Sequence, residues 1–172
     1  TGLFARQAGG AVRVTYGGSQ VLCTATVDSR VREGIDFLPL TCDYIAKTYA
    51  AGRIPGGFFK REGKLTETET LTSRLIDRPT RPLFPKGFNR ELQIVAFVIS
   101  HDKINDTDVL ALNGASCAAL ISDAPFQGPY GAVRIGRVDG ELIANPTFEQ
   151  RDASDMNMIV AATREAICMV EG

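Results

Sequence analysis

The segment LQIVAFVIS, residues 92–100, constrains the fold of this chain most. It is almost entirely apolar and rich in β-branched residues. A run of this length and composition predicts a central β-strand that is buried on both faces. The remaining segments must therefore supply neighbouring strands and covering helices.

Further strands are expected on both sides of this segment. Residues 11–16 and 20–27 alternate apolar and polar side chains across a Gly-Gly turn, which predicts an antiparallel hairpin. Residues 37–44 predict a third strand, which Pro39 limits to an edge or a bulge. Later strands are expected at residues 132–138, from Leu142, at 156–162 and at 166–170.

Two helices are expected between these strands. The sequence Thr66-Glu67-Thr68-Glu69 is a capping box that opens the first helix, and Pro79 and Pro82 end it after at most about four turns. The second helix spans residues 109–121, after several candidate N-caps at 105–108, and its small residues predict close packing on a sheet. This order of elements predicts an α+β domain, a mixed β-sheet with packed helices.

Length and composition are those of one domain, residues 1–172. The four cysteines are widely scattered without a CxxC pair, and the chain has one histidine, so a zinc site or a disulfide framework is not expected. Reduced thiols favour a cytoplasmic protein. No apolar run is long enough to span a bilayer. The chain begins with Thr1-Gly2 rather than with methionine, so we expect a piece of a longer protein.

Charge is unevenly distributed, although the formal net charge is only −1. Between Arg53 and Arg90 there are nine Lys and Arg residues and four Asp and Glu residues, and the rest of the chain is acidic. A positive segment in an otherwise acidic protein predicts a local anionic partner.

Within this segment, Phe58 and Phe59 follow a Pro-Gly-Gly turn and precede Lys60 and Arg61. Two rings on a basic, glycine-hinged loop are typical of a grip on single-stranded nucleic acid, in which bases stack on the rings and cations hold the backbone. The alternative is that the two rings fold under the loop.

Arg74, Arg78 and Arg81 are spaced four and three residues apart, so they share one face if the helix persists to Arg81. Arginine forks match phosphate oxygens, and such a row can follow a polyanion backbone. Asp77 lies three residues after Arg74 and four before Arg81, which leaves an ion-pair network open as an alternative.

Groups suited to catalysis are few. His101 has no flanking nucleophile motif, and we interpret it as a structural or solvent-facing residue. Asp106 and Asp108 lie near a helix start, where negative charge is stabilised, which favours capping over metal binding. The residues alone therefore indicate an α+β domain that grips single-stranded RNA or DNA, without a recognisable active site.

Three motifs carry a more specific resemblance: GLFARQA at residues 2–8, AGRIPGGFFKRE at 51–62 and RLIDRPTRPLFP at 74–85. Together they resemble the first RNase PH-type domain of the bacterial polynucleotide phosphorylase family, and the resemblance covers essentially the whole chain. It implies an RNase PH-type fold (ribosomal protein S5 domain 2-like). It also implies a parent chain with a helical linker, a second RNase PH domain, and KH and OB-fold domains, assembled as a homotrimeric ring.

The resemblance also implies a function. Enzymes of this family degrade mRNA from the 3′ end with inorganic phosphate and Mg²⁺, and release nucleoside diphosphates. The basic phenylalanine loop is implied to line the channel and to stack on threaded single-stranded RNA. Lys60 stands where the family often has arginine, which keeps the charge but loses the planar fork. The candidate RNA-binding residues are Arg53, Phe58, Phe59, Lys60, Arg61, Arg74, Arg78 and Arg81.

The same resemblance places the chemistry outside this chain. The family's phosphate-binding serine pair falls here on Thr107 and Asp108, and its Asp…Asp-x-Lys motif falls on Arg151, Asn157 and Ile159. An aspartate would repel phosphate, and the other three residues lack the magnesium ligands and the cation that the chemistry needs. We therefore expect no catalytic and no metal-binding residue here.

The expected role is accordingly to guide RNA and to form the ring, while the second RNase PH domain cuts the RNA. Two alternatives stay open: a self-sufficient phosphorolytic nuclease of the tRNA-trimming kind, and a structural ring subunit that never touches RNA.

Overall fold

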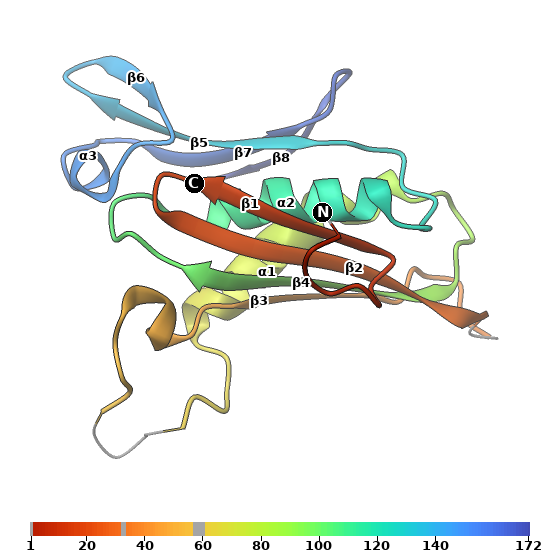
Figure 1. Ribbon diagram of the computed structural model, residues 1–172. Coiled ribbons are helices and arrows are strands. Elements are labelled where there is room, and N and C mark those ends of the chain that lie inside the picture. Colours follow the sequence, from red (N-terminus) through yellow and green to blue (C-terminus); the bar gives the residue numbers. More distant parts are fainter. Residues whose placement is uncertain (1, 32–33, 57–60) are drawn as a thin grey trace.

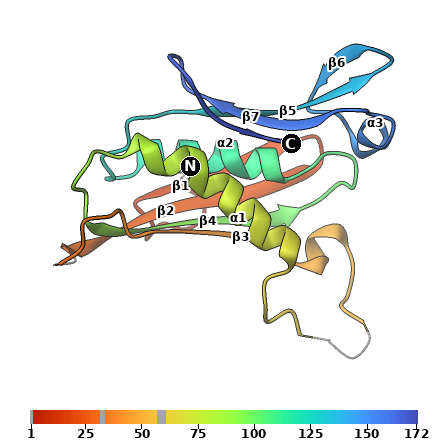
Figure 2. The same ribbon diagram turned by 180° about the vertical axis from the view of Figure 1, so that it is seen from behind.

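The computed structural model describes residues 2–31, 34–56 and 61–172. In these ranges two four-stranded sheets enclose a layer of helices (Figures 1 and 2). The first sheet has the order β1-β2-β4-β3, and the second has the order β6-β5-β7-β8. The α+β class is confirmed, and the first sheet is mixed as predicted, because β3 alone runs parallel to its neighbour.

The elements occur in the following positions. The first sheet contains β1 (Gly10–Tyr16), β2 (Ser19–Val31), β3 (Leu40–Ile45) and β4 (Arg90–Ser100). The second contains β5 (Gly131–Val138), β6 (Glu141–Ala144), β7 (Asn157–Ala162) and β8 (Ile167–Glu171). The long helices are α1 (Glu67–Thr80) and α2 (Asp108–Ile121), and the short ones are η1 (Thr48–Ala51), η2 (Arg81–Leu83) and α3 (Phe148–Asp152).

Strand β3 lies at an edge of the first sheet, as the sequence predicted, but it begins at Leu40 rather than at residue 37, so Pro39 lies just outside it. A proline cannot donate a ladder hydrogen bond, so it precedes the strand. Parallel pairing sets Ile45 opposite Phe97 of β4. The segments that follow β3 and β4 therefore leave the same end of the sheet.

Strand β4 is central, between β2 and β3, but only one of its faces is fully buried. Leu92, Ile94 and Ala96 face the helices and have no exposed surface, whereas Glu91 and Gln93 on the opposite face are exposed. The prediction of burial on both faces is wrong, because α1 and α2 both lie on the same side of this sheet (Figure 1).

The predicted capping box opens α1. Thr66 Oγ1 accepts a hydrogen bond from the Glu69 amide at 3.2 Å, and Glu69 Oε2 accepts one from the Thr66 amide at 2.7 Å. The helix continues through Pro79 to Thr80 and then tightens into η2. It therefore has the length that the sequence predicted.

Helix α2 packs closely on β1 and β2, as its small residues predicted. A Cβ atom added to Gly114 would lie only 2.5 Å from Cys23 Sγ, so a larger residue does not fit at this contact. All four cysteines are free thiols. No helix in the described ranges is both long and apolar enough to cross a membrane.

Candidate nucleic-acid interface

The described parts of the segment between β3 and α1 project away from both sheets (Figure 1). Arg53 and Arg61 lie on this segment and are exposed. Phe58, Phe59 and Lys60 lie outside the described residues, so their contacts with RNA stay predictions from the sequence.

Two glutamates close the base of this projecting loop. Glu62 Oε1 accepts a hydrogen bond from the Thr48 amide at 2.9 Å, and the Glu62 carbonyl oxygen accepts one from Lys47 Nζ at 2.8 Å. Glu69 adds a bond from the Ala46 amide at 2.8 Å. The two ends of the loop are therefore tied together, a role for Glu62 that the sequence analysis missed and that no local pattern signals.

The charged state of the Glu69 carboxylate helps to hold the loop base closed. Burial opposes the charged carboxylate, but hydrogen bonds from the backbone amides of Thr66 and Ala46 outweigh it, and the pKa of Glu69 is lowered. Glu69 therefore stays charged and holds the loop base near neutral pH.

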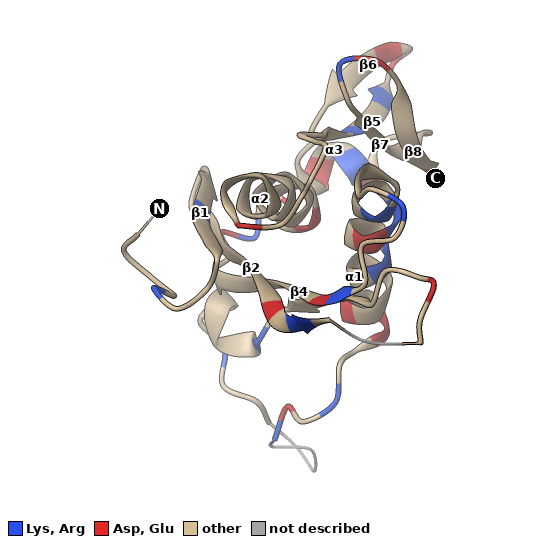
Figure 3. Cartoon of the chain, turned by 90° about the vertical axis from the view of Figure 1, so that its right-hand side faces the viewer, with Lys and Arg blue, Asp and Glu red and all other residues tan. Residues whose placement is uncertain are grey.

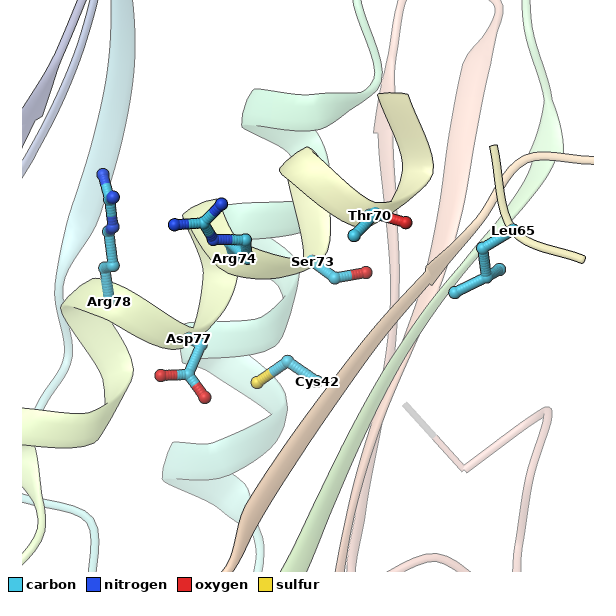
Figure 4. Close-up of a pocket in the computed structure, with 7 residues that line it drawn as sticks. All are labelled: Cys42, Leu65, Thr70, Ser73, Arg74, Asp77 and Arg78. Carbon is cyan, nitrogen blue, oxygen red and sulfur yellow. The ribbon is translucent and has the colours of Figure 1, made fainter. Parts of the chain in front are cut away.

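Arg74 and Arg78 lie beyond the loop base on the same side of α1 (Figure 4). Both line an open pocket of about 340 Å³, which Leu65 of the loop also lines. Arg78 forms an ion pair with Glu171 of β8. Arg74 is exposed and forms no ion pair with a carboxylate of the described residues.

Arg81 differs from the other two arginines. Its guanidinium binds both carboxylate oxygens of Asp77, at 2.8 and 2.6 Å, and donates to the carbonyl oxygens of Leu38 and Leu40 at 2.8 and 3.3 Å. The hydrogen bond to Asp77 raises the pKa of Arg81. The ion-pair alternative therefore holds for Arg81, which joins the end of α1 to the start of β3.

Cations gather along α1 and on the loop beside it (Figure 3). Among the described residues of α1 and of the loop beside it, four exposed cations form no ion pair: Arg53, Arg61, Lys64 and Arg74. Exposed guanidinium groups of this kind keep their donors free for an anionic ligand.

The positions matched to a catalytic site converge elsewhere, between α2 and the second sheet. Arg134 of β5 donates hydrogen bonds to Asp108 and to Asn157, and Arg151 donates one to Asp106. Arg134 is only 7% exposed. The sequence analysis missed Arg134, although an arginine inside an apolar strand is a usable signal for a buried ion pair.

The charged side chains of this group, Asp106, Asp108, Arg134 and Arg151, are paired with one another inside the protein. Burial, and then the neighbouring Asp106 carboxylate, raise the pKa of Asp108, and Arg134 works against this rise. Thr107 is also buried, and its hydroxyl shares a hydrogen bond of 2.6 Å with Tyr44. We name the group of Asp106, Asp108, Arg134, Arg151 and Asn157 the Arg134 network.

The remaining candidates have structural roles. His101 Nδ1 accepts a hydrogen bond from the Lys103 amide at 2.8 Å, and its ring stacks on Phe148 with the centroids 5.7 Å apart. Asp106 Oδ1 accepts the Asp108 amide at 3.3 Å, which is a capping contact. These contacts hold the His101 ring against the turn that follows β4 and against α3.

Two family models match this chain: the 3′ exoribonuclease family domain 1 over residues 1–125, and domain 2 of the same family over residues 128–172. The chain belongs to the 3′ exoribonuclease (RNase PH) family. It is 60% identical over all 172 residues to the polyribonucleotide nucleotidyltransferase of Syntrophotalea carbinolica, and 58% identical to that of Sorangium cellulosum. It spans 25% and 23% of the lengths of these relatives. The predicted resemblance to the first RNase PH-type domain of the polynucleotide phosphorylases is confirmed.

A solved structure shows the same fold. This chain superposes on a chain from the structure of the Archaeoglobus fulgidus exosome with RNA bound to the active site, with a TM-score of 0.73 and 11% sequence identity. The match covers 98% of this chain and 74% of that one. The RNase PH-type fold expected from the sequence is therefore confirmed.

The Arg134 network bears on the Mg²⁺ that polynucleotide phosphorylases are expected to use. Guanidinium groups lie against both Asp106 and Asp108, so these carboxylates are already neutralised from within this RNase PH-type domain. The residues 2–31, 34–56 and 61–172 contain no group of three or more potential metal ligands. Asp106 and Asp108, with arginines against them, do not fit a magnesium ion.

Proposed function

We propose that this chain is the RNA-guiding, ring-forming domain of a phosphate-dependent 3′-to-5′ exoribonuclease, a polynucleotide phosphorylase that releases nucleoside diphosphates in mRNA degradation. In this proposal it is the first of two RNase PH domains of its parent protein, residues 1–172, and works in a cytoplasmic homotrimer. The second RNase PH domain uses inorganic phosphate and Mg²⁺.

The Arg134 network supports this division of roles most directly. A phosphorolytic site needs donors and cations that are free to take phosphate. Here the two arginines nearest the matched positions are already bonded to Asp106, Asp108 and Asn157. This supports the proposal that the phosphate and the metal ion of phosphorolysis are bound by another part of the enzyme.

The RNA-guiding role is supported by the cations outside that network. Arg53 and Arg61 lie on the projecting loop, and Arg74 lies on the pocket that Leu65 joins to the loop base. A strand that stacks on the loop could place its phosphates beside these guanidinium groups. Phe58, Phe59 and Lys60 complete the proposed grip, on the evidence of the sequence motif.

Phosphorolysis by the chain itself is the first test. The chain is incubated with labelled oligoadenylate, inorganic phosphate and Mg²⁺, and released ADP is measured. No release is expected. Phosphate-dependent release from a preparation free of full-length enzyme would contradict the proposal and favour the self-sufficient nuclease.

RNA binding is the second test. Phe58→Ala combined with Phe59→Ala is expected to weaken binding of the oligoadenylate, since each base that stacks on a ring contributes roughly 1–3 kcal/mol. Phe37→Ala is the matched control, because Phe37 is 60% exposed and lies outside the loop. Unchanged binding in the double variant would favour the structural ring subunit.

A further inference from the structure

A second basic pocket lies where the chain leaves β3 and β4. Because these strands are parallel, η1 and the turn at residues 101–103 emerge side by side, and the His101 amide donates to the Ala50 carbonyl oxygen at 2.9 Å. The pocket between them measures about 290 Å³. Its polar lining consists of Lys47, Thr48, Arg53, His101 and Lys103.

This pocket is separate from the one on α1, because the two share no lining residue. Arg53 belongs both to this pocket and to the projecting loop, so the pocket lies at the loop's base on the side of β4. A strand held by the loop would pass close to it.

Three of the lining side chains, those of Lys47, Arg53 and Lys103, are cationic, and a carboxylate beside them is that of Glu62, which accepts the Thr48 amide at 2.9 Å. No Asp or Glu is among the described residues that line the pocket. Lys47 Nζ makes one hydrogen bond, to the Glu62 carbonyl oxygen, and an ammonium group has three donors. The nearby Asp102 carboxylate accepts hydrogen bonds from the Gly18 amide at 3.0 Å and from Asn105 Nδ2 at 2.7 Å. It is therefore bonded to residues of the neighbouring turns and not to the cations of the pocket.

Lys103 is held in an unusual conformation. Its φ of 63° lies in the left-handed region, which disfavours a long side chain and favours glycine or asparagine. The turn is fixed by the bond from the Lys103 amide to His101 Nδ1 and by bonds from the Ile104 and Asn105 amides to Asp102 Oδ1, each 2.8 Å. The backbone conformation therefore does not favour lysine at this position.

Thr48 adds an unused hydroxyl. Its Oγ1 is buried and has no hydrogen-bond partner among the residues that the structure describes. Buried hydroxyl groups normally have a partner. Thr48 is also a lining residue of the pocket, beside cations whose free donors match the oxygen atoms of a phosphate group.

We infer that this pocket binds a backbone phosphate of single-stranded RNA, as a second anchor at the loop base beside the α1 arginines. The inference rests on the proposed function and extends it, because Lys47, Thr48, His101 and Lys103 lie outside the arginine row and the phenylalanine motif. Arg53 is the residue that links the loop to this anchor.

The test replaces Lys103 in the full chain. Lys103→Asn removes the charge and suits the left-handed backbone, so the variant is expected to fold with an unchanged or higher melting temperature. Binding of fluorescent oligoadenylate is measured by anisotropy between 50 and 200 mM KCl. Loss of one phosphate contact is expected to lower the salt slope by about 0.7 and the affinity about fivefold at 0.1 M salt.

Two controls make the result specific. Lys103→Arg keeps the charge and is expected to bind nearly as the unchanged chain does. Lys86→Asn removes an exposed lysine near the start of β4, at the opposite end of the sheet, and is expected to leave the slope unchanged. Equal affinities and slopes for Lys103→Asn and the unchanged chain would overturn the inference.

Failure of the inference can be told apart from failure of the proposed function. If the unchanged chain does not bind the oligonucleotide, both fail. If Arg74→Gln weakens binding and Lys103→Asn does not, the proposed function stands and the inference fails. If potassium phosphate weakens RNA binding more than KCl of equal ionic strength, and Lys103→Asn removes that difference, the pocket holds free phosphate and the assignment to the RNA backbone is overturned.

Discussion

At the scale of single residues, Arg74 and Arg78 of α1 and Arg81 of η2 show that arginines at helical spacing can have different tertiary contacts. Arg81 is hydrogen-bonded to Asp77 and to the carbonyl oxygens of Leu38 and Leu40. Arg78 pairs with Glu171, and Arg74 has no ion-pair partner among the described residues. Equal helical spacing therefore does not give equal availability to a ligand.

This difference predicts that glutamine at position 81 lowers stability, whereas glutamine at position 74 weakens RNA binding. Arg81→Gln removes the bonds to Asp77 and is expected to lower the free energy of unfolding. The loss should be only about 1 kcal/mol, because these bonds are partly exposed. Arg74→Gln is expected to leave that free energy unchanged and to weaken oligoadenylate binding about fivefold at 0.1 M salt. Urea denaturation and anisotropy titration measure the two effects. Similar profiles for the two variants would contradict this division.

Arg134 is the residue whose loss should cost most. Arg134→Met leaves Asp108 without its buried partner and Asp106 with Arg151 alone, and we expect the free energy of unfolding to fall by about 3–5 kcal/mol. Adding Asp108→Asn to this variant should recover part of the loss, because it removes one unpaired buried charge. Urea denaturation of both variants checks this. A double variant no more stable than Arg134→Met would show that Asp108 carries no charge penalty.

At the scale of elements, the projecting loop is held by contacts between its two ends. Glu62 binds the Thr48 amide and Lys47 across the loop base, although these residues are far apart in sequence. Such a closure fixes where the loop leaves the molecule and adds little to the core.

Glu62→Ala should therefore loosen the loop without unfolding the domain. We expect trypsin to cleave at Arg53 and Arg61 several times faster, because local opening exposes the loop backbone to the protease. The urea midpoint should change little. Glu67→Ala, in the first turn of α1, is the control. Equal cleavage rates in the two variants would mean that the Glu62 contacts do not restrain the loop.

At the scale of the whole molecule, Asp102 links the β1–β2 turn to the turn after β4. Partial burial opposes its ionisation, but hydrogen bonds from the backbone amides of Asn105, Ile104 and Gly18 and from the Asn105 side chain prevail and lower its pKa. A depressed pKa in the folded state stabilises the fold above the unfolded value of about 3.9, and this contribution is lost as the pH falls below it.

The acid limb of unfolding should report this carboxylate. The free energy of unfolding of the unchanged chain is expected to fall as the pH drops from about 4.5 to 2.5. In Asp102→Asn the fall over the same interval should be shallower, since this group no longer takes up a proton on unfolding. Urea denaturation at several pH values measures both slopes. Parallel slopes would show that Asp102 has the same pKa in both states.

Much of the fold followed from local patterns. The hairpin turn at Gly17-Gly18, the capping box at Thr66, the edge position of the strand near Pro39 and the small-residue face of α2 depend on neighbours in the sequence. The grouping of eight strands into two sheets was not predicted, because pairing between distant strands leaves no local signal. One-sided burial of β4 was missed for the same reason.

The sequence by itself determined the family and the position of the basic loop, since each is a matter of residue type at a given position. Only the tertiary structure decided which charges are free. It joined Arg134 to Asp106 and Asp108, bound Arg81 to Asp77, and brought Lys103 beside Arg53 at the ends of two parallel strands. Ion pairing depends on distance in space, and folding sets that distance between residues that lie far apart along the chain.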